Sequence, residues 1–185
     1  MTAPTVQLPG YVAGTWVLDP VHSEASFVSR HLVSKVRGRF QKLEGVINAA
    51  ENPLDSTITV SIDPTTIYTN NEMRDNHLRS GDFLEVEKYP AISFVSTGIR
   101  QNGDDFLVDG NLSIKDVTKP ITADLEFGGI TAGPDGAPRA GFSASFEINR
   151  HDYNVNFSAV LESGGVMVGD KISIQFEVEA ILQKD

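Results

Sequence analysis

The sequence predicts an all-β fold, an antiparallel up-and-down β-barrel of about eight strands. Two observations favour it. Segments in which every second residue is apolar recur along the chain with turn residues between them, and only one stretch has the features of a helix. The alternation is clearest near the end of the chain, where Ile181 alone breaks it, in the set Ile172, Ile174, Phe176, Val178, Ala180 and Leu182. Such a strand turns one face to an apolar interior and the other to water.

The first half of the chain supplies four of the predicted strands. Asp19-Pro20 and Asn52-Pro53 are turn signals that separate apolar runs. In the last of these runs, Ile58, Val60 and Ile62 share one face. We predict strands over residues 16–18, 22–31, 36–49 and 57–62.

A short helix is predicted over residues 71–79. Asn71 is a favoured N-cap residue, Glu72 follows in the first turn, and Asp75 has the i,i+4 spacing for a pair with Arg79. A second short turn over residues 81–87 would place Phe83, Leu84 and Val86 against the sheet. We therefore expect one or two short helices around residues 71–87.

The second half returns to period-two alternation. The Gly-Pro-Asp-Gly stretch within residues 132–138 predicts a hairpin turn. The predicted strands on either side of it cover residues 92–96, 106–114, 121–127, 142–148 and 172–182.

Length and composition indicate one domain. A chain of 185 residues is close to the usual size of a single barrel. Proline and glycine interrupt the start of the chain, so we expect residues 1–13 to form a flexible N-terminal arm and residues 14–185 to form one β-barrel domain.

Charge and cysteine content exclude several classes of function. The net charge of −10 argues against nucleic-acid binding, which needs a basic surface. The absence of cysteine excludes disulfides and cysteine-ligated metal sites. The N-terminus has neither a basic start nor a continuous apolar stretch, and no apolar run is long enough for a transmembrane helix. We therefore expect a cytoplasmic protein without a signal peptide.

No sequence motif for catalysis, nucleotide binding or metal binding is present. The chain lacks a nucleophile elbow, a phosphate-binding glycine loop and a zinc-binding HExxH. Its histidines are not spaced as metal ligands, so the sequence predicts no metal, no cofactor and no catalytic residue. The alternative is an enzyme whose titratable groups are assembled by the fold. His22, His31 and Asp152 are its candidate residues.

The barrel interior is the feature that bears on function. A barrel of about eight strands is either filled by side chains or holds one slender ligand. Small residues at predicted inward positions favour a cavity, namely Gly110, Ala123, Ala144 and Ala180. Packing of large residues against small ones would also use glycine and alanine, so a packed barrel stays an alternative at this stage.

One basic stretch stands out in this acidic chain. Residues 25–43 contain no acid, and they include Arg30, Lys35, Arg37, Arg39 and Lys42. At the mouth of a barrel this stretch would bind a phosphate or pyrophosphate head group. The alternative is an ordinary solvated strand edge.

Four segments, in the same order, resemble the YceI-like family. They are WVLDPVHSEASFVSRHLVSKVRGRF (16–40), NHLRSGDFLEVEKYPAISF (76–94), GNLSIKDVTKPITADLEF (110–127) and AGFSASFEINRHDYNVNF (140–157). The resemblance covers roughly residues 14–182. It implies a bacterial protein with a lipocalin-like barrel, no established catalytic residues, and a long apolar tunnel for a polyisoprenoid or another long-tailed amphiphile. A homodimer is a further expectation carried over from the family.

Two positions depart from the family pattern. Asp116 and Asn154 stand where glycine is usual. Both are predicted to lie in turns, where Asp and Asn tolerate left-handed backbone better than other residues. If the first turn rims the pocket, Asp116 would disfavour an anionic head group.

The hypothesis from sequence is a non-enzymatic protein that carries or sequesters a polyisoprenoid, an isoprenoid quinone or a similar amphiphile. Its alternatives are an enzyme acting on such a molecule and a packed structural or stress-response barrel. Strand parity selects the tunnel residues, which are Phe27, Phe40, Phe94, Leu112, Ile114, Phe142, Phe146, Ile148, Phe176 and Val178. The residues predicted at the head-group end are Arg30, His31, Arg37 and Arg39.

Overall fold

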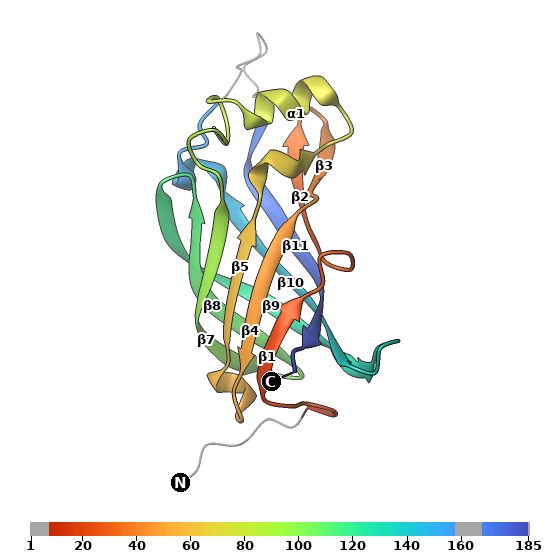
Figure 1. Ribbon diagram of the computed structural model, residues 1–185. Helices are drawn as coiled ribbons and strands as arrows, with labels where there is room; N and C mark the ends of the chain where they lie inside the picture. Colours follow the sequence, from red (N-terminus) through yellow and green to blue (C-terminus); the bar gives the residue numbers. More distant parts are fainter. Residues whose placement is uncertain (1–7, 158–167, 185) are drawn as a thin grey trace.

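The chain forms a closed antiparallel β-barrel with one α-helix across one end (Figure 1). The computed structural model describes residues 8–157 and 168–184. The strands are β1 (Gly14–Leu18), β2 (Glu24–His31), β3 (Ser34–Phe40), β4 (Leu43–Ala49), β5 (Thr57–Ile62), β6 (Ile67–Tyr68), β7 (Ile92–Asn102), β8 (Asp105–Ile114), β9 (Val117–Ala132), β10 (Pro138–Asn149) and β11 (Val168–Leu182). The helix is α1 (Glu72–Arg79), and three short 3₁₀ turns are η1 (Pro53–Asp55), η2 (Pro64–Thr66) and η3 (Arg150–Tyr153).

Strand β11 closes the barrel. One of its edges pairs with β10, and the other pairs first with β2 and then with β1. The closed ring has the order β1-β4-β5-β7-β8-β9-β10-β11, and β2, β3 and β6 extend the sheet from β11. The predicted barrel of about eight strands is therefore confirmed, with extra strands added to the ring.

The predicted strand over residues 36–49 is two strands, β3 and β4. The break falls at Gln41 and Lys42, whose backbone N–H groups both donate to the hydroxyl of Thr66 at 3.1 Å. A side chain thus satisfies these two donors in place of a neighbouring strand, which allows the chain to change direction.

Helix α1 begins as predicted. The side chain of Asn71 accepts a hydrogen bond from the Arg74 N–H at 3.0 Å. The predicted pair between Asp75 and Arg79 is wrong. Asp75 is buried and accepts a hydrogen bond from the backbone N–H of Thr69. Arg79 instead donates to the backbone carbonyls of Thr65 and Ile67. Both side chains bind the segment that precedes the helix instead of each other.

The second helix allowed for over residues 81–87 is absent; this segment consists of turns. Phe83 is nevertheless buried, as the predicted contact with the barrel requires.

The two turns that depart from the family pattern differ from each other. Asn154 adopts the expected left-handed conformation, with φ of 59°. In the β8–β9 turn it is Lys115, with φ of 58°, that is left-handed. Asp116, the next residue, does not have a positive φ. Both residues therefore lie in turns as predicted, but in the β8–β9 turn the left-handed position belongs to Lys115 and not to Asp116.

The N-terminal arm is described only from Leu8 onwards. Residues 1–7 lie outside the described residues, and the flexibility of the arm stays a prediction. Within the described part, the hydroxyl of Tyr11 donates to the carbonyl of Ala50, and Trp16 donates to the carbonyl of Val12 at 3.0 Å. In the described ranges, no helix is long and apolar enough to cross a membrane.

Two glycines in the barrel wall let phenylalanine rings approach the backbone closely. A Cβ placed on Gly38 would be 2.2 Å from the ring of Phe27, its cross-strand partner. A Cβ on Gly110 would be 2.3 Å from the ring of Phe94. The prediction that Gly110 leaves open space in the interior is therefore wrong, because the ring of Phe94 fills the position.

We predict that Gly38→Ala destabilises the protein. The added methyl must displace the Phe27 ring, and overpacking of this kind costs about 1–3 kcal/mol. Urea unfolding followed by circular dichroism measures the change. Gly98→Ala is the control, because a Cβ on Gly98 meets no atom within 4 Å. Equal stability of the two variants would contradict this account of the wall.

Candidate functional site

The barrel encloses an apolar cavity that begins at the end opposite α1. It has about 1270 Å³ of empty space, part of which is open to solvent. Leu8 and Tyr11 line it from the N-terminal segment and Pro53 from η1. Further along, its wall is formed by inward-facing side chains from most strands of the ring. The few polar residues in this wall include Ser56 and Ser93.

A second cavity of about 920 Å³ of empty space lies towards α1. Leu78 from the helix and Phe83 and Leu84 from the following turn cover it. The two cavities share one wall residue from each of five strands, which are Ile62, Ile92, Leu112, Phe146 and Phe176. The two spaces therefore lie end to end along the barrel.

All of the tunnel residues named from the sequence line these cavities. Phe94, Phe142 and Val178 line the first, and Phe27, Phe40, Ile114 and Ile148 line the second. Leu112, Phe146 and Phe176 line both. The rings of Phe146 and Phe176 stack with their centroids 6.2 Å apart where the cavities meet. Contact of these side chains with a ligand stays a prediction.

Small residues account for part of the space. Ala123 and Ala144 line the first cavity, as predicted. Ala180 is fully buried and lines neither cavity, because it packs between Leu18 and Ala140 on the neighbouring strands. Ala123 and Ala144 therefore leave space for the cavity, whereas Ala180 lets β11 pack closely between β1 and β10 where the ring closes.

Arg150 is a charged wall residue that the sequence analysis did not name. It is buried, lines the second cavity and continues the inward parity of Phe146 and Ile148 along β10 and into η3. Its guanidinium donates to the backbone carbonyls of Gly169, Val155 and Phe157 at 2.7–2.9 Å. Burial lowers its pKa, and the nearby carboxylate of Asp170 acts in the opposite direction.

Tyrosines stand at both ends of the space. Tyr153 lines the second cavity, and Tyr11 lines the first. Burial raises the pKa of both phenols. The hydroxyl of Tyr11 lies 3.2 Å from that of Ser56. The tyrosines thus stand at the two ends, and the wall residues that both cavities share are all apolar.

None of the predicted head-group residues lines either cavity. Arg30, Arg37 and Arg39 are exposed and alternate with inward residues such as Phe27 and Phe40. His31 is half-buried at the end of β2 and is absent from both walls. Strand parity explains the placement, because inward phenylalanines force these arginines to the outer surface.

Among the described residues, no histidine lines a cavity. His151 and His77 lie close to carboxylates, at 2.8 Å from Asp170 and Asp82 respectively. Asp152, the third residue named for a possible enzyme, is exposed in η3.

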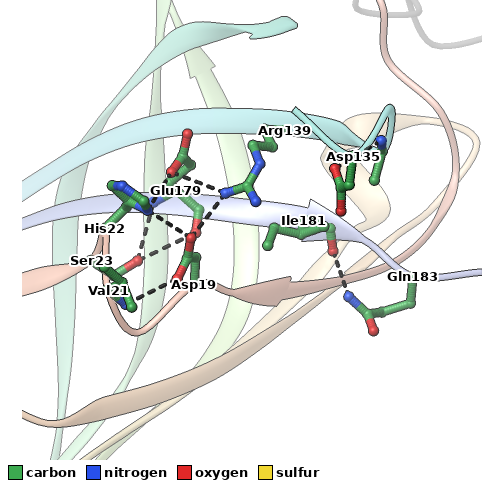
Figure 2. A network of polar contacts seen from close by, with 10 residues as sticks. Asp19, Val21, His22, Ser23, Asp135, Arg139, Glu179, Ile181 and Gln183 are labelled. Atoms are coloured by element: carbon green, nitrogen blue, oxygen red, sulfur yellow. Dashed lines mark hydrogen bonds and ion pairs between the residues drawn. The ribbon is translucent and has the colours of Figure 1, made fainter. Parts of the chain in front are cut away.

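His22 belongs to a network of charged groups on the barrel wall (Figure 2). Its Nδ1 lies 2.8 Å from Asp19 and 3.3 Å from Glu179, and the guanidinium of Arg139 lies 2.9 Å from the same Asp19 oxygen. The hydrogen bond from His22 is the main cause that lowers the pKa of Asp19 to about 2, and it raises the pKa of His22. The network joins the β1–β2 turn to β10 and β11.

The carboxylates and imidazole of this network have the spacing of a metal site, since their ligand atoms lie within 4.8 Å of one another. Arg139 already places a positive charge against both Asp19 and Glu179. We therefore interpret the cluster as an ion-pair network that fixes the closure of the barrel.

The sequence matches the model of the YceI-like domain family over residues 16–180. A UPF0312 protein of Staphylococcus aureus (strain MSSA476) is 36% identical over 167 residues, which cover 89% of this chain and 95% of that protein. The Campylobacter jejuni YCEI protein has a crystal structure that is similar with a TM-score of 0.70 at 31% identity, covering 84% of this chain and 90% of the other.

Two more distant structures share the fold. Burkholderia cenocepacia BcnA has a TM-score of 0.77 at 21% identity, covering 88% of this chain and 98% of its own. A polyisoprenoid binding domain from Saccharophagus degradans has a TM-score of 0.70 at 18% identity, covering 91% and 98%.

The network predicts a specific acid dependence. The folded-state pKa of Asp19 lies near 2, below its ordinary 3.8. Its carboxylate therefore stabilises the fold above about pH 4, and this contribution is lost as the pH falls towards about 2. Asp19→Asn should lower the melting temperature at pH 6 and flatten its decline between pH 4 and 2. Part of the decline in melting temperature should remain in this variant, because Asp109, whose pKa Arg100 also lowers to about 2, loses its charge over the same pH range.

Thermal unfolding at a series of pH values tests this, with Asp104→Asn as the control. Asp104 is an exposed carboxylate in the β7–β8 turn and should follow the wild-type curve. An Asp19→Asn curve parallel to wild type over the acid range would contradict the role given to the network.

Proposed function

The chain belongs to the YceI-like domain family, and we propose that it carries or sequesters a long-chain lipophilic molecule in its barrel. The ligand class is a polyisoprenoid, an isoprenoid quinone or a similar amphiphile. The observation that carries the proposal is the pair of apolar cavities placed end to end, which offers a long tail a path along the barrel.

Burial of the tail supplies the affinity. Each enclosed CH₂ contributes roughly 0.8 kcal/mol, so an isoprenoid chain of several units binds without specific polar contacts. Side chains such as Leu112, Phe146 and Phe176 provide contact where the cavities meet.

The polar groups of the wall favour a neutral head group. Arg150 is a cation in the second cavity, but its guanidinium donates to three backbone carbonyls. A phosphate or pyrophosphate would have to compete with these bonds inside a low-dielectric space. An alcohol or a quinone needs only one or two hydrogen bonds, which tyrosines and serines at the ends of the space provide. We therefore favour a prenyl alcohol or quinone over a prenyl phosphate.

The same features argue for a binding protein without catalysis. Titratable side chains in the described cavity walls are Tyr11, Tyr153 and Arg150, whereas His22, His31 and Asp152 lie elsewhere. Arginine and tyrosine with raised phenol pKa values are poor general bases near neutral pH. The name of the S. degradans neighbour, a polyisoprenoid binding domain, agrees with this class of ligand, although at 18% identity that likeness concerns the fold.

The packed-barrel alternative loses support from the cavities themselves. A structural barrel filled by its own side chains would leave few voids larger than a water molecule. Here the wall encloses two adjacent apolar spaces, and these cavities argue against a packed structural or stress-response barrel without a ligand.

We predict that Phe146→Asp greatly reduces ligand retention. Phe146 lines both cavities, and a carboxylate there would be buried beside an apolar tail. With tritiated solanesol, a polyprenyl alcohol, as the probe, retention after gel filtration should fall about tenfold or more. Thr59→Asp is the control, since Thr59 is exposed on the outer face of β5 and its cross-strand partners Val46 and Val95 carry no charge. Circular dichroism shows whether each variant is folded.

Ala144→Phe tests the same idea without a buried charge. Ala144 lines the first cavity, and a phenyl ring there removes space without adding a polar group. Solanesol retention should fall while a short prenol such as geraniol is still bound. Unchanged solanesol retention in folded Phe146→Asp and Ala144→Phe would refute the cavity as the binding site.

A further inference from the structure

The β2–β3 hairpin ends in an exposed apolar tip. Its two-residue turn is Leu32-Val33, between His31 and Ser34, which pair across the strands. Leu32 is 42% exposed and Val33 is 97% exposed. Single exposed apolar residues are common, but two consecutive ones at a hairpin tip offer an apolar surface that nothing in the described chain covers.

The backbone at this turn is unusual for the residues that occupy it. Leu32 has φ of 54°, in the left-handed region. A two-residue hairpin turn with a positive φ at its first central residue favours glycine there, because glycine adopts positive φ at low cost. A leucine is strained there, and an observed outlier of this kind supports a functional hypothesis.

The outer face just below the tip is basic and unpaired. Arg30 and Lys35 lie directly opposite each other across the strands, and like charges in this position are destabilising. Arg37 follows on the same face. Within the described ranges, none of these three side chains forms an ion pair with a carboxylate. On the adjoining strand β11, Asp170 is engaged by His151 at 2.8 Å and by Arg150 at 3.8 Å.

This hairpin also forms part of the wall of the second cavity. Phe27, Ser29 and Phe40 line that cavity from the inner face of the same two strands. The tip lies at the end of the barrel that α1 covers (Figure 1), where Met73 of the helix is 84% exposed. An apolar tip with basic flanks thus stands at the same end as the second cavity.

We propose that the hairpin tip, residues 30–37, docks the protein on an anionic lipid bilayer. Leu32 and Val33 enter the interfacial region of the bilayer, and Arg30, Lys35 and Arg37 contact lipid phosphates. Basic residues flanking exposed apolar ones are the combination that binds membrane surfaces. The charge of the tip opposes the net charge of −10, so docking also orients this end of the barrel towards the bilayer.

A bilayer relieves two of these local costs. Contact with anionic head groups removes the repulsion between Arg30 and Lys35, and insertion removes the exposure of Val33. The proposal concerns the outer surface only, so it is independent of whether the cavity holds a lipid.

Co-sedimentation of the full chain with vesicles tests the proposal. We expect binding to vesicles of equal parts phosphatidylcholine and phosphatidylglycerol, little binding to phosphatidylcholine alone, and a decrease with salt. Lys35→Gln with Arg37→Gln should lower the partition coefficient about 30-fold, at about 1 kcal/mol per charge. Arg100→Gln with Lys184→Gln changes the net charge equally, away from the tip, and should bind almost as well as wild type.

Leu32→Gly with Val33→Asn tests the apolar part. Of the two turn residues only Leu32 has a positive φ, and glycine suits that first position, so this variant should be at least as stable as wild type in urea unfolding while its vesicle binding falls about tenfold. Three results would overturn the proposal. They are no binding to anionic vesicles, equal loss in the two charge variants, and undiminished binding by the Gly-Asn variant. Solanesol retention by the tip variants should stay at the wild-type level, which separates this proposal from the carrier function.

Discussion

Closure of the sheet through β11 is the constraint on which the rest of the structure depends. This strand pairs with β10 along one edge and with β2 and β1 along the other, so its register fixes which residues of its neighbours face inwards. Phe142, Ala144 and Phe146 lie opposite Val178, Phe176 and Ile174. Because a slip of one residue would turn this set outwards, the apolar space and the barrel wall are specified together.

Two groups of charged side chains stabilise the barrel, one where the ring closes and one at the α1 end. The ion-pair network of Asp19, His22, Arg139 and Glu179 joins the turn after β1 to the two strands that complete the ring. Arg150 holds the backbone around Val155 and Gly169 at the α1 end. A wall that keeps its charges in these two places can enclose an apolar tail without desolvating unpaired groups.

Period-two alternation predicted most of the strands and the parity of the wall, and the ten tunnel residues named from it all line the cavities. The same parity, applied consistently, places Arg30, Arg37 and Arg39 outside, because Phe27 and Phe40 are inside. The inward positions Phe146 and Ile148 continue at period two to Arg150, so the same parity could have predicted that Arg150 faces the interior. The ion-pair network joins residues up to 160 positions apart, Asp19 and Glu179, and no local pattern predicts it. The break at Gln41 likewise depends on a distant hydroxyl, that of Thr66.

The most direct test of the central claim is mass spectrometry of the organic extract of the purified protein, beside a mock purification from cells without it. A binding barrel should yield a long-chain isoprenoid alcohol or quinone in near-stoichiometric amount that the mock extract lacks. An empty extract, together with no uptake of added solanesol, would contradict the proposal that the cavities hold a lipid.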